Sequence, residues 1–156
     1  MSETPAQNFA IQRIFLKDVS FETPTGSEVF KQQWKPQVQL DMNTRTEKLT
    51  DNLFEVVLTL TVTANIEEEK IGFLCEIQQA GIFSCEGFSG DQLRQIHSVN
   101  CPEILFPYAR EAIDSLVTKG SFPPLMLAPI NFDALFKQAM AQQAKNEAAP
   151  AVEKTH

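Results

Sequence analysis

The feature that most constrains this fold is a stretch of ten residues, 54–63, in which apolar side chains occupy every second position. Five of them share one face of an extended chain: Phe54, Val56, Leu58, Leu60 and Val62. The intervening positions carry mostly Thr and Glu, so the opposite face is polar. A period of two is typical of a β-strand that turns one face toward a core. The sequence therefore predicts a sheet with one buried face.

Two further segments show the same period, at residues 34–42 and 71–79. An acidic stretch, residues 67–70, joins the strand at 54–63 to the strand at 71–79. This connection is short enough for an antiparallel hairpin.

The N-terminal stretch, residues 9–22, also has the character of a strand, but it is apolar on both sides. Simple alternation divides its apolar side chains into two sets: Phe9, Ile11, Phe15, Val19 and Phe21 on one face, and Ala10, Ile14 and Leu16 on the other. Such a strand is either central in its sheet or covered by another subunit. The following residues, 24–33, have no regular period and contain Pro24 and Gly26, which predicts an unusually apolar loop.

The last third of the chain changes to a helical period. An apolar stripe runs through residues 105–117, with Pro102 as a first-turn residue and Gly120 as the C-cap. Pro107 should kink this helix or mark the true start of its longer part. A second helix is expected to begin near Asn131, which is an N-cap residue type, and its apolar face ends at about Gln143.

This order of elements, four strands followed by two helices, predicts an α+β fold. A chain of 156 residues is long enough for one domain and shows no internal boundary. We expect a single domain over residues 1–142 and a polar, mobile tail over residues 143–156.

The charge balance argues against nucleic acid as a partner, because the formal net charge is −7 and no basic run occurs. The three cysteines, an odd number without paired spacing, fit free thiols in a reducing compartment. No signal peptide and no apolar run of membrane-spanning length are visible. We therefore expect a cytoplasmic protein without direct membrane insertion.

No pattern of catalytic residues emerges, because phosphate-binding, dinucleotide-binding and nucleophile-elbow motifs are all missing. Cys85, His97 and Cys101 resemble a metal-binding set only loosely, and their spacing matches no standard zinc pattern. The acidic stretch at 67–69 lacks the alternating ligands of a calcium loop. The sequence predicts no catalytic residue, no metal site and no cofactor.

The twelve Phe residues are more informative. Each buried aromatic side chain contributes about 1.5–3 kcal/mol, so a few pockets could bind an extended peptide, with an oligomer adding avidity. The alternative is that Phe30, Trp34 and Phe136 only fill the core, and the pattern alone favours this alternative.

Three segments that together cover most of the chain carry a family resemblance: QRIFLKDVSFETP at residues 12–24, FLCEIQQAGIF at residues 73–83, and CPEILFPYAREAIDSLVTKGSFPPLMLAPINFDALF at residues 101–136. They resemble the SecB export chaperones. The resemblance implies an ATP-independent chaperone that binds unfolded preproteins and delivers them to the SecA motor. It also implies a four-stranded antiparallel sheet with two C-terminal helices packed on one side, and a homotetramer built as a dimer of dimers.

The resemblance further implies three sets of functional residues. The surface that faces SecA would contain Asp18, Glu22, Leu74 and Glu76. The contact between dimers would contain Cys75, Ile77 and Gln79, on the opposite face of the same strand. The groove for unfolded clients would contain Val29, Phe30, Trp34, Leu127, Phe132, Leu135 and Phe136, with Trp34 and Phe136 walling one pocket. The helix at 107–119 would belong to the assembly surface.

Two other classes of protein remain open at this stage. An enzyme could use Cys85 or Cys101 as its nucleophile, with His97 as the only candidate base. A structural oligomer would explain the apolar strand faces, but it gives no reason for the apolar loop at 24–33.

Overall fold

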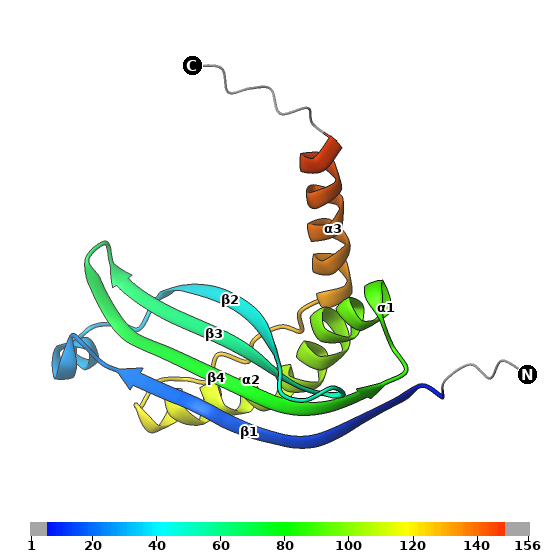
Figure 1. Cartoon of the computed structure of the whole chain (residues 1–156). Helices are drawn as coiled ribbons and strands as arrows, with labels where there is room; N and C mark the ends of the chain where they lie inside the picture. Colours follow the sequence, from blue (N-terminus) through cyan, green and yellow to red (C-terminus); the bar gives the residue numbers. More distant parts are fainter. Residues whose placement is uncertain (1–5, 149–156) are drawn as a thin grey trace, which may run out of the picture.

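The computed structural model describes residues 6–148 (Figure 1). Its elements follow one another in this order: β1 Asn8–Glu22, the 3₁₀-helix η1 Gly26–Lys31, β2 Gln37–Lys48, β3 Leu53–Glu67, β4 Lys70–Glu86, α1 Gly90–Gln95, the π-helical turn η2 Ile96–Asn100, α2 Cys101–Lys119 and α3 Phe132–Ala148. The predicted α+β class is confirmed.

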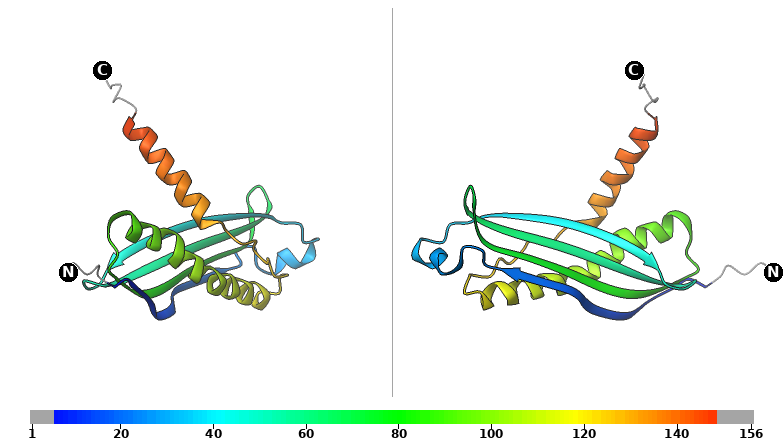
Figure 2. Two further views of the ribbon diagram at one scale, coloured as in Figure 1. Left: turned by 90° about the vertical axis from the view of Figure 1, so that its right-hand side faces the viewer. Right: turned by 60° about the vertical axis from the view of Figure 1, so that its left-hand side comes forward.

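The four strands form one antiparallel sheet in the order β1-β4-β3-β2. Tight turns join β2 to β3 and β3 to β4. From β1, at one edge of the sheet, the chain passes through η1 to β2 at the other edge. Helix α2 lies across one face of the sheet and packs on β3 and β4 (Figure 2). The core lies between α2 and this helix-covered face, and no helix within residues 6–148 covers the opposite, open face (Figure 2).

Two β-bulges in β1, between Ile11 and Arg13 and between Leu16 and Asp18, correct the predicted division of its side chains. Each bulge adds a residue and so reverses the alternation beyond it. Through the pairing with β4, Ile14 and Leu16 share the helix-covered face with Phe9, and Phe15 moves to the open face opposite Ala80. The bulges therefore divide the apolar side chains of β1 between the two faces of the sheet, and Leu16 and Val19 remain exposed beside α2.

The first helical segment starts earlier than expected, at Gly90 rather than near Pro102. Its backbone stays right-handed helical through η2, where the Cys101 N–H donates to the Ile96 carbonyl five residues back. Pro102 has no N–H to continue the ordinary ladder, and a π-helical turn absorbs the irregularity. Pro107 lies inside α2, and Gly120 ends it as predicted.

Helix α3 differs from the prediction that both helices pack on one side of the sheet. It extends away from the sheet, and its main contacts are with η2 (Figure 1). Asn131 acts as its N-cap, since its Oδ1 accepts from the Ala134 N–H at 2.9 Å. The helix continues to Ala148, past the expected end at Gln143, because residues 141–148 are good helix formers even without an apolar stripe. The remaining part of the predicted tail, residues 149–156, lies outside the described residues.

The segment between β1 and β2 is also more ordered than a loop. Residues 26–31 form η1, which buries Val29, and the Thr25 hydroxyl donates to the Ile71 carbonyl at 2.8 Å. Strand β2 begins at Gln37, so Trp34 precedes it. Among the described residues, no helix is long and apolar enough to cross a membrane.

Candidate functional site: two faces of the sheet

The open face of the sheet gathers the residues that the resemblance assigned to SecA. Strand pairing places Glu22 opposite Leu74 and Asp18 opposite Gln78, with Glu76 between these positions. Asp18 and Glu22 are exposed, whereas Leu74 and Glu76 are half-buried. The four predicted residues therefore form one contiguous acidic surface, defined here by Asp18, Glu22, Leu74 and Glu76.

This acidic surface continues onto the next two strands, which the resemblance did not indicate. The Thr61 hydroxyl donates to Glu76 Oε1 at 3.1 Å, and Asp41 pairs with Thr61 across the sheet. A shallow hollow of about 260 Å³ lies among residues of β2, β3 and β4 here, including Asp41 and Glu76. The register of the β2–β3 hairpin was the signal that could have revealed Asp41.

A salt bridge separates the acidic surface from the rest of the open face. Lys17, at the second bulge of β1, reaches across β4 and contacts Glu55 Oε1 on β3 at 2.7 Å. Glu55 is nearly buried, so this pairing compensates a carboxylate that would otherwise be costly to desolvate. The carboxylates of the acidic surface have no such partner among the described ion pairs.

The residues predicted for the contact between dimers lie on the other face of β4, inside the protomer. Cys75 and Ile77 are fully buried in the core, and the Gln79 side-chain amide donates to the Phe15 carbonyl at 3.1 Å. All three are buried within the protomer. Leu16, Val19 and one side of α2 line a nearby cleft of about 170 Å³, which Ile77 also lines.

An aromatic cluster joins η1, β4 and the segment after α2. The Trp34 ring lies 4.7 Å from Phe122 and 6.1 Å from Phe73, and Phe30 stacks on Phe122 at 5.5 Å. A Cβ on Gly72 would lie 2.8 Å from the Trp34 ring, so this glycine makes room for it. Phe30 is 56% exposed, and the cluster therefore reaches the surface.

A second apolar cluster lies where α3 begins. Phe132 is buried and meets Phe106 of α2 edge-on at 6.2 Å, beside a cleft of about 260 Å³. Leu127 and Phe136 are half-buried here, and Leu135 is exposed.

Trp34 and Phe136 thus belong to different clusters, and no aromatic contact in residues 6–148 joins them. The nearer aromatic neighbour of Trp34 is Phe122, which was not among the predicted groove residues and lies next to two prolines, outside the predicted helices.

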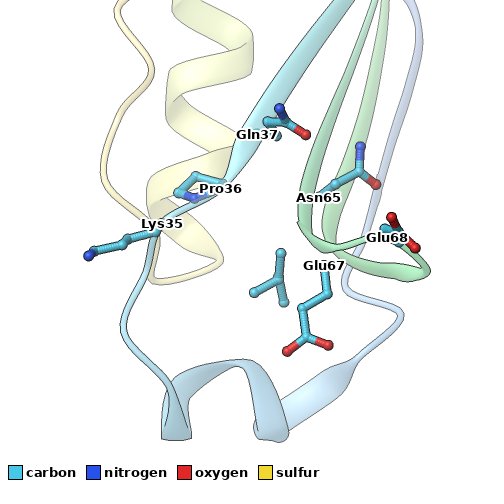
Figure 3. A pocket seen from close by; sticks show the side chains of 7 residues that line it. Lys35, Pro36, Gln37, Asn65, Glu67 and Glu68 are labelled. Carbon is cyan, nitrogen blue, oxygen red and sulfur yellow. The ribbon is translucent and has the colours of Figure 1, made fainter.

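A hollow of about 460 Å³ lies between the start of β2 and the β3–β4 turn (Figure 3). Its labelled side chains diverge: Lys35 points away from the hollow, and Glu67 and Glu68 lie on the opposite side (Figure 3). Such a spread of mixed charges offers no set of converging groups for catalysis.

The thiols are unsuited to nucleophilic chemistry. Burial raises the pKa of Cys75 to about 11 and also raises the pKa of Cys85, while burial and then the neighbouring Cys85 raise the pKa of Cys101. His97 Nε2 lies 4.0 Å from Cys85 Sγ, and burial lowers the pKa of the imidazole. A thiolate is disfavoured at all three cysteines, which removes the nucleophile that a cysteine enzyme requires. Within the described part of the chain, no three metal-ligating side chains come together.

Comparison with known proteins identifies relatives of this chain. The family model described as preprotein translocase subunit SecB matches residues 2–143. A protein-export protein SecB from Hahella chejuensis is 54% identical over 99% of this chain and 98% of its own length. One from Marinobacter nauticus is 56% identical over 95% of this chain and 90% of its own length.

A solved structure shares the fold. It is the SecB-like chaperone of Mycobacterium tuberculosis in complex with a ChAD peptide from the HigA1 antitoxin, with a TM-score of 0.63 and 15% identity. The match covers 78% of this chain and 90% of that one.

Proposed function

Because the chain belongs to the SecB family of protein-export chaperones, which are not enzymes, we propose that it binds unfolded preproteins in the cytoplasm and delivers them to the SecA motor without ATP. The observation that carries this proposal is that the two sides of the protomer expose different kinds of side chain. One side exposes aromatic and aliphatic side chains around η1 and α3, and the other exposes the acidic surface.

The client groove is proposed to run from the aromatic cluster to the start of α3. Of the seven residues that the resemblance suggested, Phe30 and Leu135 are exposed, and Trp34, Leu127 and Phe136 are half-buried. These five can contact a bound polypeptide. Val29 and Phe132 are buried, so their role is to support the groove. The structural neighbour, which binds an antitoxin peptide, supports the idea that this fold can bind a peptide.

SecA is proposed to bind the acidic surface through a basic segment. Opposite charges on two surfaces increase the association rate and specify the partner. Asp41 is included in this surface because it lies in the same cross-strand row as Glu76.

A homotetramer, built as a dimer of dimers, is the proposed assembly. Strand β1 forms an edge of the sheet, and it exposes Leu16 and Val19 beside α2. An apolar edge strand is a liability for an isolated protomer, and a second copy would cover it. Cys75, Ile77 and Gln79 would influence the contact between dimers indirectly, by setting the position of α2.

General protein export is favoured over a specialised partner such as an antitoxin. The two protein-export relatives are more than half identical to this chain, whereas the antitoxin-bound neighbour is only 15% identical.

Binding of SecA to charge-reversal variants tests the proposal. Asp18→Lys and Glu76→Lys should each weaken binding about tenfold, since loss of one charge pair and gain of one repulsion together amount to about 1.4 kcal/mol. Glu86→Lys is the matched control, because Glu86 lies on the same strand and the same face as Glu76 but at the far end of that strand. Isothermal titration with the SecA C-terminal segment measures the affinities.

Client binding is measured separately, by suppression of aggregation of a reduced, unfolded protein without nucleotide. Both reversals should leave it unchanged. A wild-type protein that neither suppresses aggregation nor binds SecA would refute the proposed function.

A further inference from the structure

The linker between α2 and α3 has an apolar outer face. Residues 122–130 contain no polar side chain, and Leu125 and Leu127 pack against the core. The side chains between and beside them are exposed: Pro123, Pro124, Met126, Ala128 and Pro129. Met126 is 76% exposed, more than any other large apolar side chain in residues 6–148. This segment leads from the aromatic cluster to α3 (Figure 1).

Met126 has a backbone conformation that is unfavourable for its residue type. Its φ is 51°, in the left-handed region, where the Cβ of an L-residue approaches the following carbonyl oxygen. Such a conformation persists only where neighbouring groups hold it in place, and it concentrates at functional sites.

Side chains of α2 hold this linker. Asp114 Oδ1 accepts from the Leu125 N–H at 3.0 Å and from the Met126 N–H at 3.3 Å. One turn earlier, Arg110 Nη1 donates to the Leu127 carbonyl at 3.4 Å. A single carboxylate oxygen therefore binds the peptide groups on both sides of the Leu125 side chain. Hydrogen bonds to a charged acceptor are stronger than those between neutral groups.

We propose that Asp114 is a positioning residue for client binding: its carboxylate holds Met126 in the left-handed conformation and keeps the apolar face of the linker presented to apolar stretches of an unfolded polypeptide. This inference rests on the proposed function. Methionine is well suited to a surface that binds polypeptides of different sequence, because its unbranched, polarizable side chain adapts to different apolar partners. The prolines of the linker lack N–H donors, so the linker recognises a client through side chains rather than by adding a strand.

The test uses the full-length chain and a fluorescent peptide rich in Leu and Phe, with a Ser-substituted peptide of equal length as the negative probe. Asp114→Ala should weaken binding of the apolar peptide about fivefold, because only a fraction of the molecules then present the competent linker. Asp114→Asn keeps an acceptor oxygen and should stay within about twofold of wild type. Asp51→Ala, in the β2–β3 turn, is the matched control.

A double-mutant cycle separates positioning from general stability. Glycine adopts positive φ without strain, so Asp114→Ala should cost less affinity in a Met126→Gly background than in wild type. Met126→Ser should also weaken binding, whereas Leu49→Ser, at a residue 44% exposed in a distant turn, should not.

The outcomes distinguish this inference from the proposed function. Wild type that ignores both peptides would refute the proposed function itself. Wild type that binds the apolar peptide while Asp114→Ala binds equally well would overturn the inference alone. An equal loss in both backgrounds of the cycle would also overturn it, because Asp114 would then act without Met126.

Discussion

At the scale of single residues, His97 is the group whose protonation is most clearly coupled to the fold near neutral pH. Its ring packs against Phe54 with centroids 4.4 Å apart, and it lies in the π-helical turn that contacts α3. Burial lowers its pKa from the ordinary value of 6.5, so the folded state favours the neutral imidazole.

The sign of the resulting pH dependence follows from the lowered pKa. Neutral His97 contributes its full share to the free energy of unfolding above pH 6.5, where the imidazole is neutral in both the folded and the unfolded state. This contribution is lost as the pH falls from 6.5 toward the lowered pKa of the folded state, because the unfolded state then binds the proton more readily. Wild type should therefore lose stability between pH 7.5 and 5.5, and His97→Phe should lose less. Urea unfolding at both pH values and at one protomer concentration measures this difference. Equal losses for the two proteins would contradict the prediction.

At the scale of elements, the aromatic cluster connects segments that are far apart in the chain. Phe122 contacts Phe30 and Trp34 from the crossover between β1 and β2, and it also lies 5.1 Å from Phe73 of β4. It is only 5% exposed, although it belongs to an irregular linker. The Phe122 ring therefore packs the two irregular segments that border the proposed groove against the sheet.

Phe122→Ala should lower the free energy of unfolding by about 3–5 kcal/mol, the usual cost of removing a buried aromatic ring. Phe30→Ala is the matched comparison, because this ring is mostly exposed and should cost much less stability. Chemical denaturation at a fixed protomer concentration gives both values. A small effect of Phe122→Ala would show that the cluster does not tie the linker to the sheet.

At the scale of the whole molecule, the sheet separates two proposed interactions. Alternate residues of β4 point toward α2 and toward the open face, so Ile77 and Leu74 serve different sides of the same strand. A change beneath α2 can therefore alter the assembly while the open face is unchanged, and the reverse also holds.

Ile77→Trp should shift the proposed tetramer toward dimers. The larger ring does not fit beneath α2, and overpacking of this kind costs about 1–3 kcal/mol and displaces the neighbouring element. Leu74→Trp, on the open face of the same strand, should leave the mass unchanged. Light scattering measures the mass of each variant, and an intact tetramer for Ile77→Trp would contradict the role assigned to α2.

The sequence by itself determined the α+β class, the strands β3 and β4, and the side of β4 on which Leu74 and Glu76 lie. Each of these depends on a local period, which the residues of one segment express without help from the rest of the chain. The resemblance added the acidic set, and the strand register brings its four members together.

Only the tertiary structure decided the faces of β1, the direction of α3 and the partner of Trp34. The two bulges of β1 arise from its pairing with β4, and no alternation within β1 marks them. Phe122 and Asp114 act on residues that lie in other segments, so their roles follow from distances in space. Patterns predict which way a side chain points within an element, but the contacts between elements depend on packing across the whole fold.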